Sequence, residues 1–162
     1  MMNDNLYNRA QKESDAMTII GYTFGNRDRL WEALQGKGSL VTQIGGRLLP
    51  DHNRKMAMVG DGIITSVIRI DAFNDDLMTK GQTNRRVVTL ANNERLISLC
   101  DDKGLTPCIN VSPVNGGVVS RDNKSATVEA IVGAVFLDAG MDAAEMVMEN
   151  LGIIGPAASH LL

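Results

Sequence analysis

Apolar residues recur at helical spacing along much of the chain, most strongly in residues 53–72. There they return at steps of three and four, which places them on one face of a helix. They are Met56, Val59, Ile63, Val67 and Ile70, and Met58, Ile64 and Ile68 widen the apolar surface. The pattern predicts a long helix that the rest of the protein encloses on most sides.

The same periodicity predicts helices over residues 5–20, 27–35, 83–100, 125–139 and 143–151. Asn26 is placed to cap the second of these, Gly104 follows the end of the helix over 83–100, and Gly140 and Asp142 separate the last two. Residues 36–51, rich in glycine, predict a loop with a short helical turn at 40–44. Residues 105–120 predict an irregular connection with at most one extended piece near Val118. The predicted fold class is all-α.

Composition agrees with a helical domain. Of the 162 residues, 44% are hydrophobic but only 4% are aromatic, so nine methionines and many aliphatic residues must fill the core. The length suggests one domain over residues 1–152, followed by a tail of small residues over 153–162.

Charge and cysteine content narrow the function classes. The net charge is −3, and no long run of lysine or arginine occurs, which argues mildly against strong electrostatic binding of nucleic acid. Arg85, Arg86 and Arg95 are the best basic candidates, but a solvated helix face is the favoured explanation for them. Cys100 and Cys108 fit reduced thiols rather than a disulfide framework or a CxxC metal site.

The sequence contains no signal-peptide core and no apolar run near the roughly 18 residues of a membrane span. We therefore expect an intracellular protein without a membrane partner, in a cytoplasmic, nuclear or mitochondrial compartment.

Each of the two most apolar helices carries a single embedded acid, Asp61 in the first and Glu129 in the second. An ionised carboxylate among apolar neighbours is costly unless a cation, a donor or water offsets it. Either Asp61 lies on a narrow hydrated stripe, or the two acids meet at a shared metal. Sequence spacing alone leaves both interpretations open.

Four segments of the chain stand in a recognisable order. Residues 21–24 read GYTF, residues 30–34 read LWEAL, residues 56–61 read MAMVGD and residues 127–138 read TVEAIVGAVFLD. They resemble the GYxF turn, the LxxAL helix, the ERLEFLGDAVL signature and the DxxEAxxGAxYLD helix of the ribonuclease III domain, an all-helical endonuclease fold for double-stranded RNA. The last segment is the most specific, and the resemblance covers about residues 19–151.

The resemblance implies an active site of four carboxylates, paired as ExxxD and DxxE, that bind Mg²⁺ for phosphodiester cleavage. The second member of each pair is present, as Asp61 and Glu129, and we predict these two as the catalytic and metal-binding residues. Ala57 and Ala126 stand at the first positions. Steps of four and three keep each pair on one helix face, so both replacements remove ligands from the same site.

Three further positions bear on this site. A further acidic position of the family signature is Arg54 here, and its aromatic dimer contact is Met58. Arg54 is placed either to leave the site open or to pair with one of the remaining acids and close it. Asp122 is a weaker candidate to compensate for the missing carboxylates.

The first hypothesis is therefore a ribonuclease III-like endoribonuclease that acts on double-stranded or structured RNA, with weakened activity that depends on Mg²⁺ or Mn²⁺. The second is an inactive relative that serves as an RNA-binding or structural module. The family implies a two-fold homodimer, and this chain resembles its short members without a double-stranded RNA-binding domain. A small-molecule or metal-storage helical protein is a distant third, since His52 and His160 lie in a predicted loop and tail. No RNA-binding residues and no organic cofactor are predicted.

Overall fold

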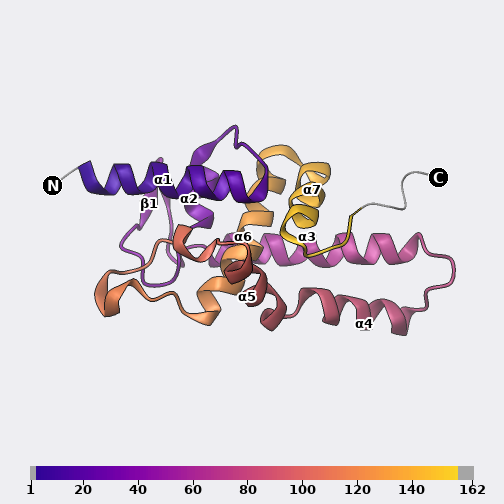
Figure 1. Cartoon of the computed structure of the whole chain (residues 1–162). Coiled ribbons are helices and arrows are strands. Elements are labelled where there is room, and N and C mark those ends of the chain that lie inside the picture. Colours follow the sequence, from indigo (N-terminus) through magenta and orange to yellow (C-terminus); the bar gives the residue numbers. More distant parts are fainter. Residues whose placement is uncertain (1–2, 157–162) are drawn as a thin grey trace.

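Two central helices, α3 and α6, pack against each other more extensively than any other pair of elements described in the domain. We analysed a computed structural model that describes residues 3–156. The helices are α1 Asn3–Ile20, α2 Arg27–Ala33, α3 Arg54–Phe73, α4 Lys80–Ala91, α5 Asn93–Asp102, α6 Arg121–Ala139 and α7 Met141–Leu151, arranged as in Figure 1. Short 3₁₀ helices at Thr106–Cys108 and Val114–Gly117 occupy the connection before α6. The predicted all-α fold class is confirmed.

The core surrounds α6, whose side chains between Ser125 and Val135 are almost all buried. Helix α3 packs chiefly against α6, while α2, α5 and α7 cover the remaining faces of α6. Fully buried Leu30, Ile64, Leu96, Ile131 and Met148 come from five different helices and meet in one cluster. A helix apolar on nearly all sides is expected at the centre of such a domain.

The predicted α3 boundaries are correct to within one residue, but its predicted buried face is partly wrong. The buried positions are Met56, Ala57, Gly60, Ile64, Val67, Ile68 and Ala72. Val59 and Ile70, predicted to face inward, are exposed, and so is Met58 with 76% of its surface accessible. The helix is turned about its axis relative to the prediction because Gly60 makes the close contact with α6. Glycine has no apolar side chain, so it did not count toward the predicted buried face.

The predicted single helix over residues 83–100 is two helices, α4 and α5, separated at Asn92. Asn92 adopts extended backbone angles, and its side-chain oxygen accepts a hydrogen bond from the N–H of Arg95. Its amide nitrogen donates to the carbonyls of Val88 and Thr89, so one side chain serves both helix ends. Figure 1 shows α4 beside the second half of α3, and α4 has no buried residue.

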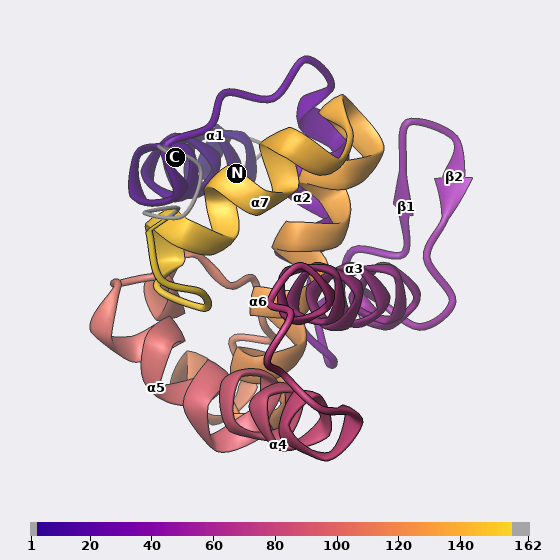
Figure 2. The ribbon, with the colours of Figure 1, turned by 90° about the vertical axis from the view of Figure 1, so that its right-hand side faces the viewer.

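The loop between α2 and α3 forms a β-hairpin where a helical turn was predicted. Strand β1, Gln43–Ile44, pairs antiparallel with β2, Arg47–Leu48, at the edge of the molecule in Figure 2. Gly45 and Gly46 between them have φ of 54° and 80°, which glycine adopts without steric cost. Burial of Ile44 fixes the hairpin to the domain.

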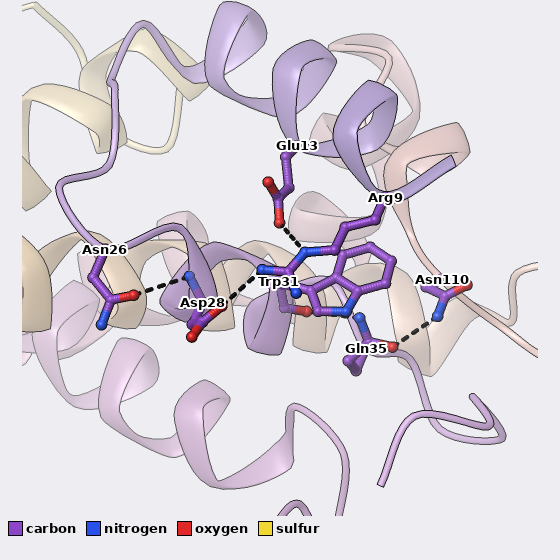
Figure 3. Close-up of polar contacts among 7 residues, drawn as sticks. All are labelled: Arg9, Glu13, Asn26, Asp28, Trp31, Gln35 and Asn110. Atoms are coloured by element: carbon purple, nitrogen blue, oxygen red, sulfur yellow. Dashed lines mark hydrogen bonds and ion pairs between the residues drawn. The ribbon is translucent and has the colours of Figure 1, made fainter. Parts of the chain in front are cut away.

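Polar contacts join α1 to α2 around the guanidinium of Arg9 (Figure 3). It donates to Glu13 at 2.6 Å and to Asp28 at 2.8 Å, and it lies 5.4 Å from the centre of the Trp31 ring. The Glu13 side chain is only 4% exposed, so Arg9 supplies the charge that its carboxylate needs. Burial opposes ionisation of Arg9, but the hydrogen bonds to Asp28 and Glu13 outweigh it and raise its pKa.

Arg95 connects α5 to the chain that follows α7. It was predicted on a solvent-facing side, but its guanidinium donates to the carbonyls of Leu90, Gly152 and Ile153. Ile153 is fully buried in the main core cluster, although it begins the predicted tail. The part of that predicted tail beyond position 156, His160 included, lies outside the described residues.

Candidate functional site

Helices α3 and α6 cross with almost no side chain between them. A Cβ placed on Gly60 would lie 1.7 Å from the carbonyl oxygen of Glu129, and one on Gly133 would lie 2.6 Å from that of Met56. Such a close approach is open only to glycine at both positions. The crossing therefore fixes the residues beside Gly60 and Gly133 relative to one another.

Asp61 and Glu129 lie beside this crossing and interact electrostatically across it. Burial raises the pKa of Glu129 to about 7, and the negative charge of Asp61 adds to the increase, while Arg54 opposes it. Asp61 itself is exposed, which agrees with a place on a hydrated stripe of α3. Glu129 is half-buried. The charge of Asp61 acts on Glu129, while a metal shared by the two acids stays a prediction.

Ala57 and Ala126 stand one helical turn before the two acids, and each is only 4% exposed. Neither methyl group can bind a cation, and the described residues contain no cluster of three or more histidine, cysteine, aspartate or glutamate side chains suited to a metal ion. Asp122 is exposed in the first turn of α6, and its role as a compensating acid stays a prediction.

Arg54 contacts an amide rather than a carboxylate. Its Nη2 atom donates to Oδ1 of Asn123 at 3.3 Å, and among the described side chains no carboxylate lies within 4.0 Å of its guanidinium. Of the two alternatives, Arg54 therefore leaves the acids unpaired. Its charge nevertheless acts on Glu129, because it lowers that residue's pKa against the effect of burial.

Asn123 is a buried polar residue that sequence reasoning did not single out. It lies in the first turn of α6 and connects this helix to Arg54 and to the backbone of Lys37. A signal existed, since position 123 shares the inward spacing of Ala126 and Ala130, where a polar residue must find partners.

Asn53, which precedes α3, is also fully buried near the start of the site. Its amide nitrogen donates to the Ala33 carbonyl and to the Thr127 hydroxyl, which ties α3 to α2 and α6. Its Oδ1 atom has no hydrogen-bond partner among the described atoms.

The site lies on open surface rather than in a deep cavity. A hollow of about 710 Å³ lies at the junction of α3 and α4, and it is lined by Phe73, Met78 and Thr83 but not by Asp61 or Glu129. Small-molecule sites are usually enclosed. An exposed Asp61 and a half-buried Glu129 beside a helix crossing instead suit a large ligand that approaches from outside.

The donor set fits one hydrated divalent cation and does not fit a pair of them. Mg²⁺ retains several waters and is commonly bound by one or two carboxylates together with substrate phosphate. Asp61 and Glu129 meet that minimum in number, and a nearby cation would offset the repulsion from Asp61 that helps to raise the Glu129 pKa. A pair of metals would need more carboxylates than these two.

A family model described as the Ribonuclease III domain matches residues 54–140, more than half of the chain. This chain belongs to the ribonuclease III domain family. The match begins at Arg54 and ends at Gly140, so it includes the crossing, both acids and both alanines.

Two solved structures from Campylobacter jejuni share this ribonuclease III fold. Both are of the nuclease domain of its ribonuclease III, and one description concerns structural flexibility in a region involved in dimer formation. That structure is 22% identical, with a TM-score of 0.72 over 85% of this chain and 93% of its own. The other is 20% identical, with a TM-score of 0.69 over 88% and 95%. At this identity the likeness establishes the fold.

Within residues 3–156 of this family member, no helix combines the length and apolar character needed to cross a membrane.

Proposed function

We propose that this domain is an endoribonuclease that acts on double-stranded or structured RNA, with Asp61 and Glu129 as its catalytic and metal-binding residues. The observation that carries the proposal is the electrostatic coupling of these two acids beside the Gly60–Gly133 crossing. The close backbone contact fixes the two helices that carry these acids relative to each other, and a cation or a reacting phosphate requires such a preorganised site.

The two acids have different tasks in this proposal. Asp61 is exposed and presents its carboxylate to the solvent. Glu129, with a pKa of about 7, must release its proton before it can act as a ligand. A bound Mg²⁺ or Mn²⁺ supplies activation of water and stabilisation of charge on the phosphate. Loss of carboxylates at Ala57 and Ala126 leaves fewer ligands, so we expect weak metal affinity and weakened cleavage.

A duplex RNA cleavage assay in Mg²⁺ or Mn²⁺ tests this function. We expect slow cleavage by the wild type, none by Asp61→Asn, and faster cleavage by the double variant Ala57→Glu with Ala126→Asp. Cleavage by wild type and Asp61→Asn at equal rates would contradict the role of Asp61. Activity confined to the double variant would show that the natural chain is not a nuclease.

The second candidate is an inactive module for RNA binding or structural interaction. The observation that favours it is the absence, within residues 3–156, of any three-ligand metal cluster. Metal titration by calorimetry separates the two functions, because the first requires binding of Mg²⁺ or Mn²⁺ at millimolar concentration. No heat of binding, together with retained RNA affinity, would support the module.

A homodimer forms part of the proposal in either case. Helix α3 exposes Met58, Val59, Ile70 and Phe73, more apolar surface than a solvated helix normally presents. Dimer formation is also described for the nuclease domain of the Campylobacter jejuni protein. Size-exclusion chromatography with light scattering should give twice the 17.5 kDa of one chain. A mass of one chain at micromolar concentration would exclude the dimer.

A further inference from the structure

Two basic residues, Lys37 and Arg54, form hydrogen bonds with the buried Asn123 at the edge of the proposed site. Asn123 is 4% exposed, and its Oδ1 atom accepts from the backbone N–H of Lys37 at 2.8 Å and from Arg54 at 3.3 Å. Its Nδ2 atom donates back to the Lys37 carbonyl at 3.2 Å. The residue thus holds the loop after α2 and the first turn of α3 against the first turn of α6.

Neither basic side chain is neutralised by an acid. Among the described side chains, no carboxylate oxygen lies within 4.0 Å of the charged atoms of Lys37 or Arg54. Lys37 is exposed and Arg54 is partly exposed, so both remain accessible to an anion. An arginine held by a neutral amide keeps donors free for phosphate, whereas one bound to a carboxylate does not.

The charge of Arg54 reaches the proposed site, because it lowers the pKa of Glu129. A phosphodiester that approached Asp61 and Glu129 alone would meet two negative groups. The Arg54 guanidinium offsets this repulsion and attracts the same phosphate, and the exposed ammonium of Lys37 adds positive charge on the other side of Asn123. The net charge of −3 makes such a local basic pair more important than it would be on a basic protein.

We propose that Arg54 and Lys37, positioned by Asn123, bind a backbone phosphate of RNA beside Asp61 and Glu129. The inference rests on the proposed function, since it takes RNA as the ligand. It adds a phosphate contact that requires no metal. The domain therefore holds RNA at this point in the absence of divalent cations.

Binding of a fluorescently labelled RNA duplex to the full chain, measured by anisotropy in EDTA over a series of KCl concentrations, tests the inference. We expect Arg54→Gln and Lys37→Gln each to weaken binding by about 5- to 10-fold and to reduce the salt slope by about 0.9. Arg54→Lys, which keeps the charge, should keep the slope. The matched control is Arg27→Gln, an exposed arginine at the first position of α2, at the end away from Lys37. Its affinity should stay within about twofold of the wild type.

The outcomes separate this inference from the proposed function. Urea unfolding of each variant first confirms that it is folded. If Arg54→Gln and Lys37→Gln bind like Arg27→Gln with the wild-type salt slope, the phosphate contact is overturned and the nuclease proposal stands. The phosphate contact is likewise overturned, and the nuclease proposal stands, if the wild type cleaves RNA in Mg²⁺ but does not bind it in EDTA. A wild type that neither binds nor cleaves RNA overturns both.

Discussion

The hydroxyl of Tyr22 donates a 2.5 Å hydrogen bond to the carboxylate of Asp138, 116 residues further along the chain. The same carboxylate accepts from the backbone N–H groups of Gly25 and Asn26. The Tyr22 ring also packs edge-on against Phe24, with the ring centroids 5.0 Å apart. The GYTF turn is thereby joined to the end of α6, two segments that carried the family resemblance.

We predict that Asp138→Asn lowers the free energy of unfolding by about 2 kcal/mol and Tyr22→Phe by about 1 kcal/mol. Burial works against ionisation of Asp138, but hydrogen bonds from Tyr22, Gly25 and Asn26 lower its pKa below the usual value. Its contribution is therefore present above the unfolded pKa and lost as pH falls through the folded one. Urea unfolding at neutral pH and near pH 3 checks this. A variant deficit that is equal at both pH values would contradict the prediction.

Gly60 and Gly62 provide a matched pair on α3. A Cβ on Gly60 would collide with the Glu129 carbonyl, while one on Gly62 would meet no atom within 4 Å. We expect Gly60→Ala to cost more than about 3 kcal/mol, because the two helices must separate. Gly62→Ala should instead stabilise the helix by up to about 1 kcal/mol. Thermal unfolding followed by circular dichroism compares them, and similar melting temperatures for the two variants would refute the close crossing.

Glu129 should make stability fall as pH rises. Its folded pKa of about 7 lies above the ordinary value of 4.5, so the folded state favours the protonated carboxyl. The resulting stability is complete below the unfolded pKa and is lost as pH rises through the folded pKa. We expect Glu129→Gln to exceed the wild type by about 1 kcal/mol at pH 8, after allowance for partial exposure, and to match it near pH 4.

Chemical unfolding across this pH range measures the effect, and Asp61→Asn supplies a control. Removal of the Asp61 charge should lower the Glu129 pKa and flatten the pH dependence, because that charge contributes to the increase. A wild-type curve parallel to that of Glu129→Gln throughout would show that the Glu129 pKa is not raised in the folded state, and an unchanged pH dependence in Asp61→Asn would show that the two acids are not coupled.

Arg9 and Glu13 should behave as a coupled pair. Arg9→Gln leaves the Glu13 carboxylate buried without its main cation, so we expect a loss of about 2 to 3 kcal/mol. Glu13→Gln in addition should recover part of that loss. A double-mutant cycle by urea unfolding gives the coupling energy, and strictly additive effects would mean that the pair contributes little.

Helical periodicity and family motifs were sufficient to predict most helices and the approximate boundaries of α3. The break between α4 and α5 at Asn92 was not predicted, because apolar residues continue at helical spacing across it. The break depends instead on local hydrogen bonds of the Asn92 side chain. The face of α3 that is buried was predicted incorrectly for another reason. Gly60 sets it through a backbone contact with α6, and a glycine adds nothing to a hydrophobic pattern.

The candidate site divides in the same way. Asp61 and Glu129 were predicted from family motifs, and their catalytic and metal-binding roles stay a prediction, although the charge of Asp61 acts on Glu129. Asn123 was missed because its importance depends on contacts with residues 69 and 86 positions away, which no local pattern reveals. The role of Arg95 was missed for the same reason, because two of its acceptors, the carbonyls of Gly152 and Ile153, lie after α7.

Helix α4, which has no buried residue, has a consequence for hydrogen exchange. Its amides are protected by hydrogen bonds within the helix and by packing of the helix against α3 and α5. Opening it exposes little apolar surface, so it should cost far less than global unfolding. Amide hydrogens of α4 should therefore exchange with deuterium well before those of α6, and the domain should lose this helix reversibly while its central crossing remains intact.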